Sequence, residues 1–200
     1  VRVNATGESY LVTATYMGPD DSFVFETEVK YVEGDCLGLM FGAKTKDSKD
    51  DAYIFYMNRT GGGGNWWDRD TRFWKFNTGA GDTLFSNDNV GDLNSTDLFE
   101  MNKEDYKLKI IVNNDYFFAY IDGKLVHQFY LPNYQGGYLG MRIDGSAYFQ
   151  NTKVTKTDAA EIAEILDVRV EGHKLTPDFS KLDKEYSILA VDHDVESVKI

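Results

Sequence analysis

Apolar and polar residues alternate along most of the chain from position 10 to position 154. Successive side chains of a β-strand point to opposite faces, so this alternation predicts strands that bury one face and expose the other. In segment 23–31 the apolar residues at 23, 25, 29 and 31 share one face, whereas the charged residues at 26, 28 and 30 share the other. Similar patterns predict strands at 37–42, 52–58, 72–77, 106–113, 116–121 and 124–131.

Turn signals separate these segments. Asp122-Gly123 lies between two apolar runs, and this pair favours a two-residue hairpin turn because both residues adopt positive φ. In segment 138–154 the alternation continues on both sides of Gly145-Ser146, which predicts two further strands around a break. About ten strands without a helical period predict an all-β chain, folded as an antiparallel two-sheet sandwich.

The chain after position 157 follows a different pattern. Asp158 is a suitable helix cap, and Ile162, Ile165 and Leu166 share one side of a helix, so 158–166 is expected to be a short helical linker. We therefore expect the sandwich to span 1–157 and a partial β segment to follow at 167–200. That segment has too few strands for a complete sandwich, so its open edge packs on a neighbouring domain, pairs with another chain or stays mobile.

The charge balance narrows the choice of partners. The formal net charge is −12, and an acidic surface repels phosphate, which argues against nucleic acid and against an anionic membrane surface. Neutral glycans and Ca²⁺ are compatible with this charge. No apolar run approaches the roughly 20 residues of a membrane-spanning helix. The single cysteine, Cys36, excludes an internal disulfide and lies in an apolar run, so we expect it to be buried.

Catalytic motifs are weak. Glu26 and Glu28 lie two residues apart on the polar face of one strand, and retaining glycoside hydrolases use two carboxyl groups about 5–5.5 Å apart. Related enzymes carry a third acid three residues further on, where this chain has Tyr31, so no catalytic residue is assigned. The three histidines lack the spacing of zinc ligands, and no metal ligand is assigned.

Aromatic residues make up 14% of the chain, which favours some exposed rings that stack on sugar rings. They are dense after the glycine run 61–64, where Trp66, Trp67 and Arg69 stand next to Asp70. This combination suits sugar recognition, because sugar C–H faces stack on rings and hydroxyls bond to planar polar groups. The alternative is that both tryptophans clamp the glycine-rich loop.

Two acidic segments, 47–51 and 87–92, offer oxygen ligands of the kind that Ca²⁺ prefers. Neither has the spacing of an EF-hand loop. No cofactor is therefore assigned, and a structural Ca²⁺ ion stays open as an alternative.

Several segments resemble a known family. Segment 138–154 resembles the closing strands of concanavalin A-like (laminin G-like) jelly-roll sandwiches. Family 66 carbohydrate-binding modules and the C-terminal sandwich of family 32 fructosidases resemble this chain, in order, at 25–29, 38–41, 53–58, 73–76 and 140–151. The resemblance implies a jelly roll that grips a terminal fructose.

The positions that match the family's binding residues are Glu26, Glu28, Tyr53 and Asp144, while Gly42 stands where an arginine is usual. Segment 167–200 resembles the first half of a bacterial cadherin-like repeat.

We expect a non-catalytic carbohydrate-binding module of a secreted or cell-surface glycoside hydrolase. Its partners would be a neutral glycan, with fructan implied by the resemblance, and other domains of the same polypeptide. The expected ligand-binding residues are Glu26, Glu28, Tyr53, Trp66, Trp67, Arg69 and Asp144. Two rival functions are an adhesion or spacer sandwich without a ligand, and a glycoside hydrolase that uses Glu26 and Glu28.

Overall fold

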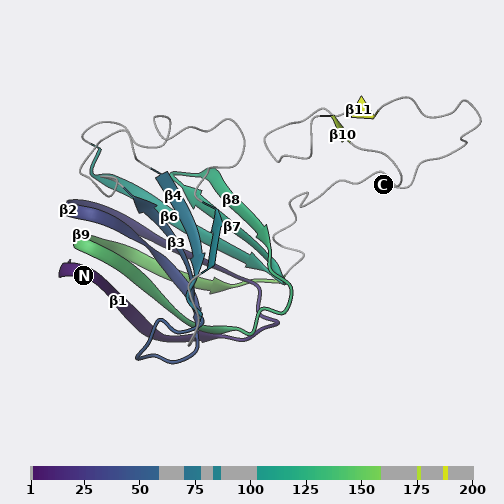
Figure 1. Ribbon diagram of the computed structural model, residues 1–200, viewed down its shortest axis with the longest axis horizontal. Helices are drawn as coiled ribbons and strands as arrows, with labels where there is room; N and C mark the ends of the chain where they lie inside the picture. The colour runs from purple at the N-terminus through teal and green to yellow at the C-terminus, as the bar shows by residue number, and fades with distance from the viewer. Residues whose placement is uncertain are drawn as a thin grey trace, which may run out of the picture. The chain divides into compact units, whose positions relative to one another are not determined.

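The computed structural model describes residues 2–58, 70–77, 83–86, 103–158, 175–176 and 187–188 (Figure 1). Contacts divide the chain into two units, 1–161 and 162–200. Apart from Asp158, the expected helical linker lies outside the described residues, as does most of the expected cadherin-like segment. In the second unit, β10 (Leu175–Thr176) and β11 (Ser187–Ile188) form an antiparallel pair.

All described elements of the first unit are antiparallel strands, which confirms the all-β prediction. Their bounds are β1 (Arg2–Met17), β2 (Phe23–Ala43), β3 (Tyr53–Asn58), β4 (Asp70–Lys75), β5 (Thr83–Ser86), β6 (Asp105–Asn113), β7 (Tyr116–Ile121), β8 (Lys124–Tyr130) and β9 (Gly137–Lys156). Within the described residues no helix is long and apolar enough to cross a membrane.

Two long strands, β2 and β9, connect the two layers of this unit. β9 pairs with β2 along nearly all of its length, while the other edge of β2 pairs first with β6 and then with β3. One layer, called the β3 layer, contains β1, β3, β4 and β5 with the adjoining halves of β2 and β9. The β6 layer contains β6, β7 and β8 with the other halves. Figure 1 shows β1, β9 and β2 as long curved strands lying side by side.

Two facing glycines lie where β2 changes partner. Gly34 on β2 pairs with Gly145 on β9, and their φ angles of 109° and 126° are accessible mainly to glycine. A Cβ atom on Gly145 would lie 2.1 Å from the carbonyl oxygen of Glu33, so the two backbones are closer than any side chain permits.

These glycines correct the prediction for segment 138–154. The Gly145-Ser146 pair does not separate two strands, because β9 runs continuously through it. A single positive φ bends the strand without reversing it, and both halves keep the same antiparallel neighbour, β2. The same bend joins the segments 23–31 and 37–42, which were predicted separately, into one strand.

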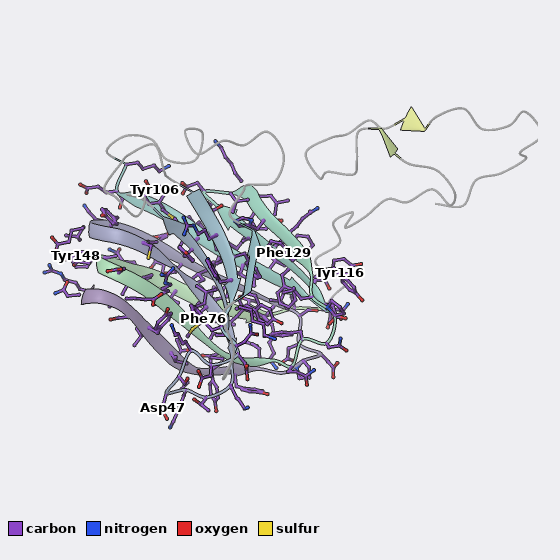
Figure 2. The ribbon with its side chains drawn as sticks, in the orientation of Figure 1. Asp47, Phe76, Tyr106, Tyr116, Phe129 and Tyr148 are labelled. Atoms are coloured by element: carbon purple, nitrogen blue, oxygen red, sulfur yellow. The ribbon has the colours of Figure 1, made fainter. Side chains whose placement is uncertain are left out.

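The inner faces of the two layers share one aromatic core. Phe41 on β2 stacks on Phe117 of β7 with ring centroids 5.0 Å apart, and Phe73 on β4 stacks on Phe129 of β8 at 4.6 Å. Figure 2 draws the side chains of this unit as sticks and labels Phe129. Each pair joins a strand of the β3 layer to a strand of the β6 layer. The layers therefore pack face to face, as the sandwich prediction requires.

The outer face of the β3 layer carries a second apolar cluster. Cys36 and Met40 belong to it, whereas Leu37, Leu39 and Phe41 alternate with them and join the main core. Cys36 is a buried thiol, which confirms its predicted burial. The β3 layer thus buries apolar side chains on both of its faces.

The hairpin between β7 and β8 forms as predicted. Asp122 and Gly123 have φ angles of 51° and 80°. The carboxylate of Asp122 also accepts a hydrogen bond from the backbone N–H of Lys107 at 2.8 Å, which fastens the turn to β6.

A buried histidine between the layers gives the fold a measurable pH dependence. Nε2 of His127 on β8 lies 2.8 Å from Oγ1 of Thr71 on β4, and burial lowers the pKa of His127 to about 4. Between pH 6.5 and pH 4 His127 binds a proton more readily in the unfolded chain than in the folded protein. The free energy of unfolding is therefore highest above pH 6.5 and falls as the pH drops below that value. We expect His127 to remove about 2 kcal/mol of stability between pH 6.5 and pH 5.

Urea unfolding of the wild type and of His127→Gln across this range would measure the effect. The variant should be less stable at pH 7 but should lose less stability on acidification. Equal slopes in the two proteins would contradict this prediction.

Candidate functional site

The expected ligand-binding residues lie on separate surfaces of the first unit. Glu26 and Glu28 are on the outer face of the β6 layer, where the register places Lys109 and Lys107 opposite them. Lys107 Nζ lies 3.3 Å from Glu26 Oε2, and Asn151 Nδ2 donates a hydrogen bond to Glu28 at 2.7 Å. Both carboxylates therefore have partners on a solvated face, and such exposed pairs contribute little to stability.

Asp144 lies on the outer face of the β3 layer, opposite Cys36 on β2 and Glu8 on β1. Seven residues of β2 lie between Glu28 and Cys36, and the glycine bend is among them. The structure thus does not bring Asp144 together with Glu26 and Glu28. Trp66, Trp67 and Arg69 lie outside the described residues.

A polar cluster next to Asp144 was not predicted from the sequence. Arg142 Nη2 lies 2.6 Å from Glu8 Oε1, and the guanidinium carbon lies 3.9 Å from the centre of the Tyr56 ring. Burial alone would raise the pKa of Glu8. A hydrogen bond from Tyr10 and the charges of Arg142 and Lys49 together lower it by more, so the pKa of Glu8 lies below its usual value. This cluster holds an ionised carboxylate on the outer face of the β3 layer.

Tyr53 lies elsewhere, at one end of the core. It is 9% exposed and stacks on Phe41 with ring centroids 5.4 Å apart. Its outer edge faces a cavity of about 430 Å³, here called the rim cavity. The side chains that define it are Tyr16, Lys44, Asp51, Tyr53, Lys75 and Tyr134.

The rim cavity forms where several segments end together. Tyr16 is near the end of β1, Tyr53 begins β3, Lys75 ends β4, and Tyr134 lies in the loop before β9. Gly42, which has a φ of 74°, lines this cavity. A Cβ atom at this position would lie 3.1 Å from Tyr134 Cε2, which is too close for the ring to keep its place. A larger residue at this position would have to displace the Tyr134 ring.

The tyrosines of the cavity differ in exposure. The Tyr16 side chain is 52% exposed, and its ring meets Tyr138 edge to face at 5.3 Å, which fixes the ring orientation. Tyr134 is only 3% exposed, and its hydroxyl has no hydrogen-bond partner within the part of the chain that the structure describes. Burial raises the pKa of Tyr134, so the hydroxyl stays protonated and can donate. An unpaired buried hydroxyl costs stability.

Charged groups stand at the mouth of the cavity. Lys44 Nζ lies 3.8 Å from Asp51 Oδ2, an exposed ion pair. Lys75 Nζ lies 5.2 Å from the centre of the Tyr53 ring. Asn133 and Gln135 add neutral amides to the lining. The cavity therefore combines aromatic faces with hydrogen-bond donors and acceptors.

Acidic side chains do not gather into a metal site in the ranges described. No group of three or more His, Cys, Asp or Glu residues suited to a metal ion occurs among them. The described segment 47–51 therefore does not combine with other acidic residues, and segment 87–92 lies outside the described residues.

Comparison with solved structures places this architecture among known β-sandwiches. The carbohydrate-binding module CBM66 from Bacillus subtilis is similar with a TM-score of 0.58 and 23% identity, over 76% of this chain and 84% of that chain. A protein of unknown function with a galectin-like fold, also from Bacillus subtilis, is similar with a TM-score of 0.51 and 13% identity, over 77% of this chain and 80% of that chain. The chain matches no protein-family model and no curated protein. These likenesses show a shared fold.

Proposed function

We propose that the first unit is a non-catalytic carbohydrate-binding module that holds one terminal sugar ring in the rim cavity. The observation that carries this proposal is the convergence of three tyrosines with amide, amine and carboxylate groups on one open cavity. Its volume of about 430 Å³ falls in the range of small-molecule sites. The fold shared with CBM66 supports the same class of function.

In this proposal the exposed ring of Tyr16 stacks on a C–H face of the sugar. The amides of Asn133 and Gln135 exchange hydrogen bonds with sugar hydroxyls. Such hydrogen bonds replace bonds to water, so a Kd of order µM to mM is expected.

The composition of the cavity favours binding over hydrolysis. Asp51 is the only carboxylate among the described residues that line it. Hydrolysis of a glycosidic bond by the common mechanisms needs two carboxyl groups flanking that bond. A hydrolase that uses Glu26 and Glu28 is less favoured, because each carboxylate has its own partner on a solvated face.

We further propose that the module has a jelly-roll topology and belongs to a secreted or cell-surface glycoside hydrolase. It would raise the local concentration of glycan near a catalytic domain by tethering. Of the residues expected from the sequence, Tyr53 belongs to the proposed cavity. Fructose specificity and ligand contacts from Glu26, Glu28, Trp66, Trp67, Arg69 and Asp144 stay predictions.

Tyr16→Ala tests the position of the site. Loss of the stacking ring is expected to weaken sugar binding about tenfold, the equivalent of about 1.4 kcal/mol, with little change in stability because the ring is half exposed. Calorimetry or NMR titration with the best ligand from a glycan array would measure it. Tyr130→Ala is the matched control, because Tyr130 is 58% exposed on β8.

Unchanged affinity in Tyr16→Ala would exclude the rim cavity as the site. Absence of binding to any array glycan, including fructans, would reject the proposed function and favour a spacer sandwich.

A further inference from the structure

The charge of the rim cavity differs in sign from that of the whole chain. Two lysines and one aspartate line it, whereas the chain has a formal net charge of −12. Lys44 is paired with Asp51 at 3.8 Å. Lys75 has no carboxylate within ion-pair distance among the described residues, and its amine lies over the Tyr53 ring.

The position of Lys75 places its charge beside an aromatic face. Its Nζ lies 5.2 Å from the centre of the Tyr53 ring, and that ring is held by stacking on Phe41. A ligand that enters the cavity therefore meets rings and a cation together. A sugar ring with an attached carboxylate offers groups complementary to both.

We propose that the rim cavity selects acidic sugars, with the ring of a terminal hexuronate against the tyrosines and its carboxylate paired with Lys75 Nζ. This inference rests on the proposed function of the same cavity. It revises the expectation of a neutral glycan, which followed from the total charge of the chain. A bound ligand responds to the nearest charges, because distant ones are screened beyond roughly 8–10 Å at ordinary salt.

The opposing explanation is that Lys75 only packs on Tyr53. In that case the lysine would only add packing at the edge of the core, and a carboxylate on the ligand would not raise its affinity. The two explanations predict different ratios of affinity for ligands that differ only at C6.

Titrations by NMR or calorimetry would compare methyl β-D-glucuronide with methyl β-D-glucoside, and the galacto pair likewise, at matched ionic strength. We expect at least one uronide to bind about fivefold more tightly than its neutral partner, the upper range for a solvent-accessible ion pair. Raising NaCl to about 0.5 M should reduce the ratio, because salt screens the pair. Lys75→Gln should bring the ratio close to one, whereas Lys75→Arg should keep most of it.

Lys46→Gln is the matched control, because Lys46 is an exposed lysine that does not line the cavity. It removes the same charge and should leave the ratio unchanged. Thermal unfolding of each variant separates a change in binding from a loss of fold.

Each remaining outcome is decisive. Equal affinity for uronide and neutral sugar would overturn the acidic-sugar inference and leave the carbohydrate-binding function intact. If neither sugar of any pair binds and no array glycan binds, the acidic-sugar inference and the carbohydrate-binding function are both overturned. Sodium acetate that shifts the same resonances with the affinity of the uronide would show a site for carboxylate alone and would overturn the assignment to sugars.

Discussion

Gly145→Ala is expected to lower the free energy of unfolding by about 4 kcal/mol, a large part of the roughly 5–15 kcal/mol that stabilises an ordinary domain. Two costs combine at this residue. Its φ of 126° strains any residue that has a Cβ atom, and that Cβ would lie 2.1 Å from Glu33 O and 2.5 Å from Gly34 Cα. Both obstructing atoms are backbone, so no side-chain rotation relieves the clash.

Gly123→Ala provides the matched control. Gly123 also has a positive φ, of 80°, but a Cβ atom there would meet nothing within 4 Å. This variant should therefore show the cost of backbone conformation alone, about 1 kcal/mol. Urea unfolding of both variants would separate the two costs. Equal destabilisation would mean that the close approach of β2 and β9 at the bend is not required.

The bend explains why the strand pattern could be predicted but the sheet topology could not. Alternation identifies which residues of a strand face inward, and it did so for segments 23–31 and 37–42. A glycine between two alternating segments is compatible with a turn and with a bend. The choice depends on a partner strand more than 100 residues away in sequence, Gly34 against Gly145, and local periodicity contains no information about that pairing.

Register likewise limits what the sequence reveals about the acidic residues. Alternation correctly placed Glu26 and Glu28 on an outer face. It could not show that β6 would bring Lys107 and Lys109 opposite them, or that Lys107 would pair with Glu26. Only the pairing of two strands separated by some 80 residues decides this.

The rim cavity was harder still to predict. Tyr53 was expected from its place in a resembling segment, but Tyr16, Lys75 and Tyr134 come from distant parts of the chain. Their side chains meet because β1, β4 and the loop before β9 reach the same end of the sandwich. A weak signal was present at Gly42, a glycine in an otherwise apolar strand, since such a residue often marks a close approach or a cavity.

The core and the proposed site are physically continuous. Phe41 contacts the rings of Tyr53, Phe117 and Tyr134, at centroid distances of 5.4, 5.0 and 6.1 Å. It lies behind the two tyrosines that form the wall of the rim cavity. The rigidity of that wall therefore depends on a residue that no ligand touches.

Phe41→Ala is accordingly expected to destabilise the protein by about 3–5 kcal/mol and, in any fraction that stays folded, to weaken sugar binding. Phe41 is fully buried, so truncation removes ring contacts in both layers and leaves a cavity behind Tyr53. Phe41→Leu is the conservative partner, because it refills much of that volume and should recover part of the stability and of the affinity. Denaturant unfolding and titration with the same sugar would measure both quantities. A folded Phe41→Ala protein with wild-type affinity would show that the wall of the cavity is held by other contacts, and binding would then have to be attributed to the rim residues alone.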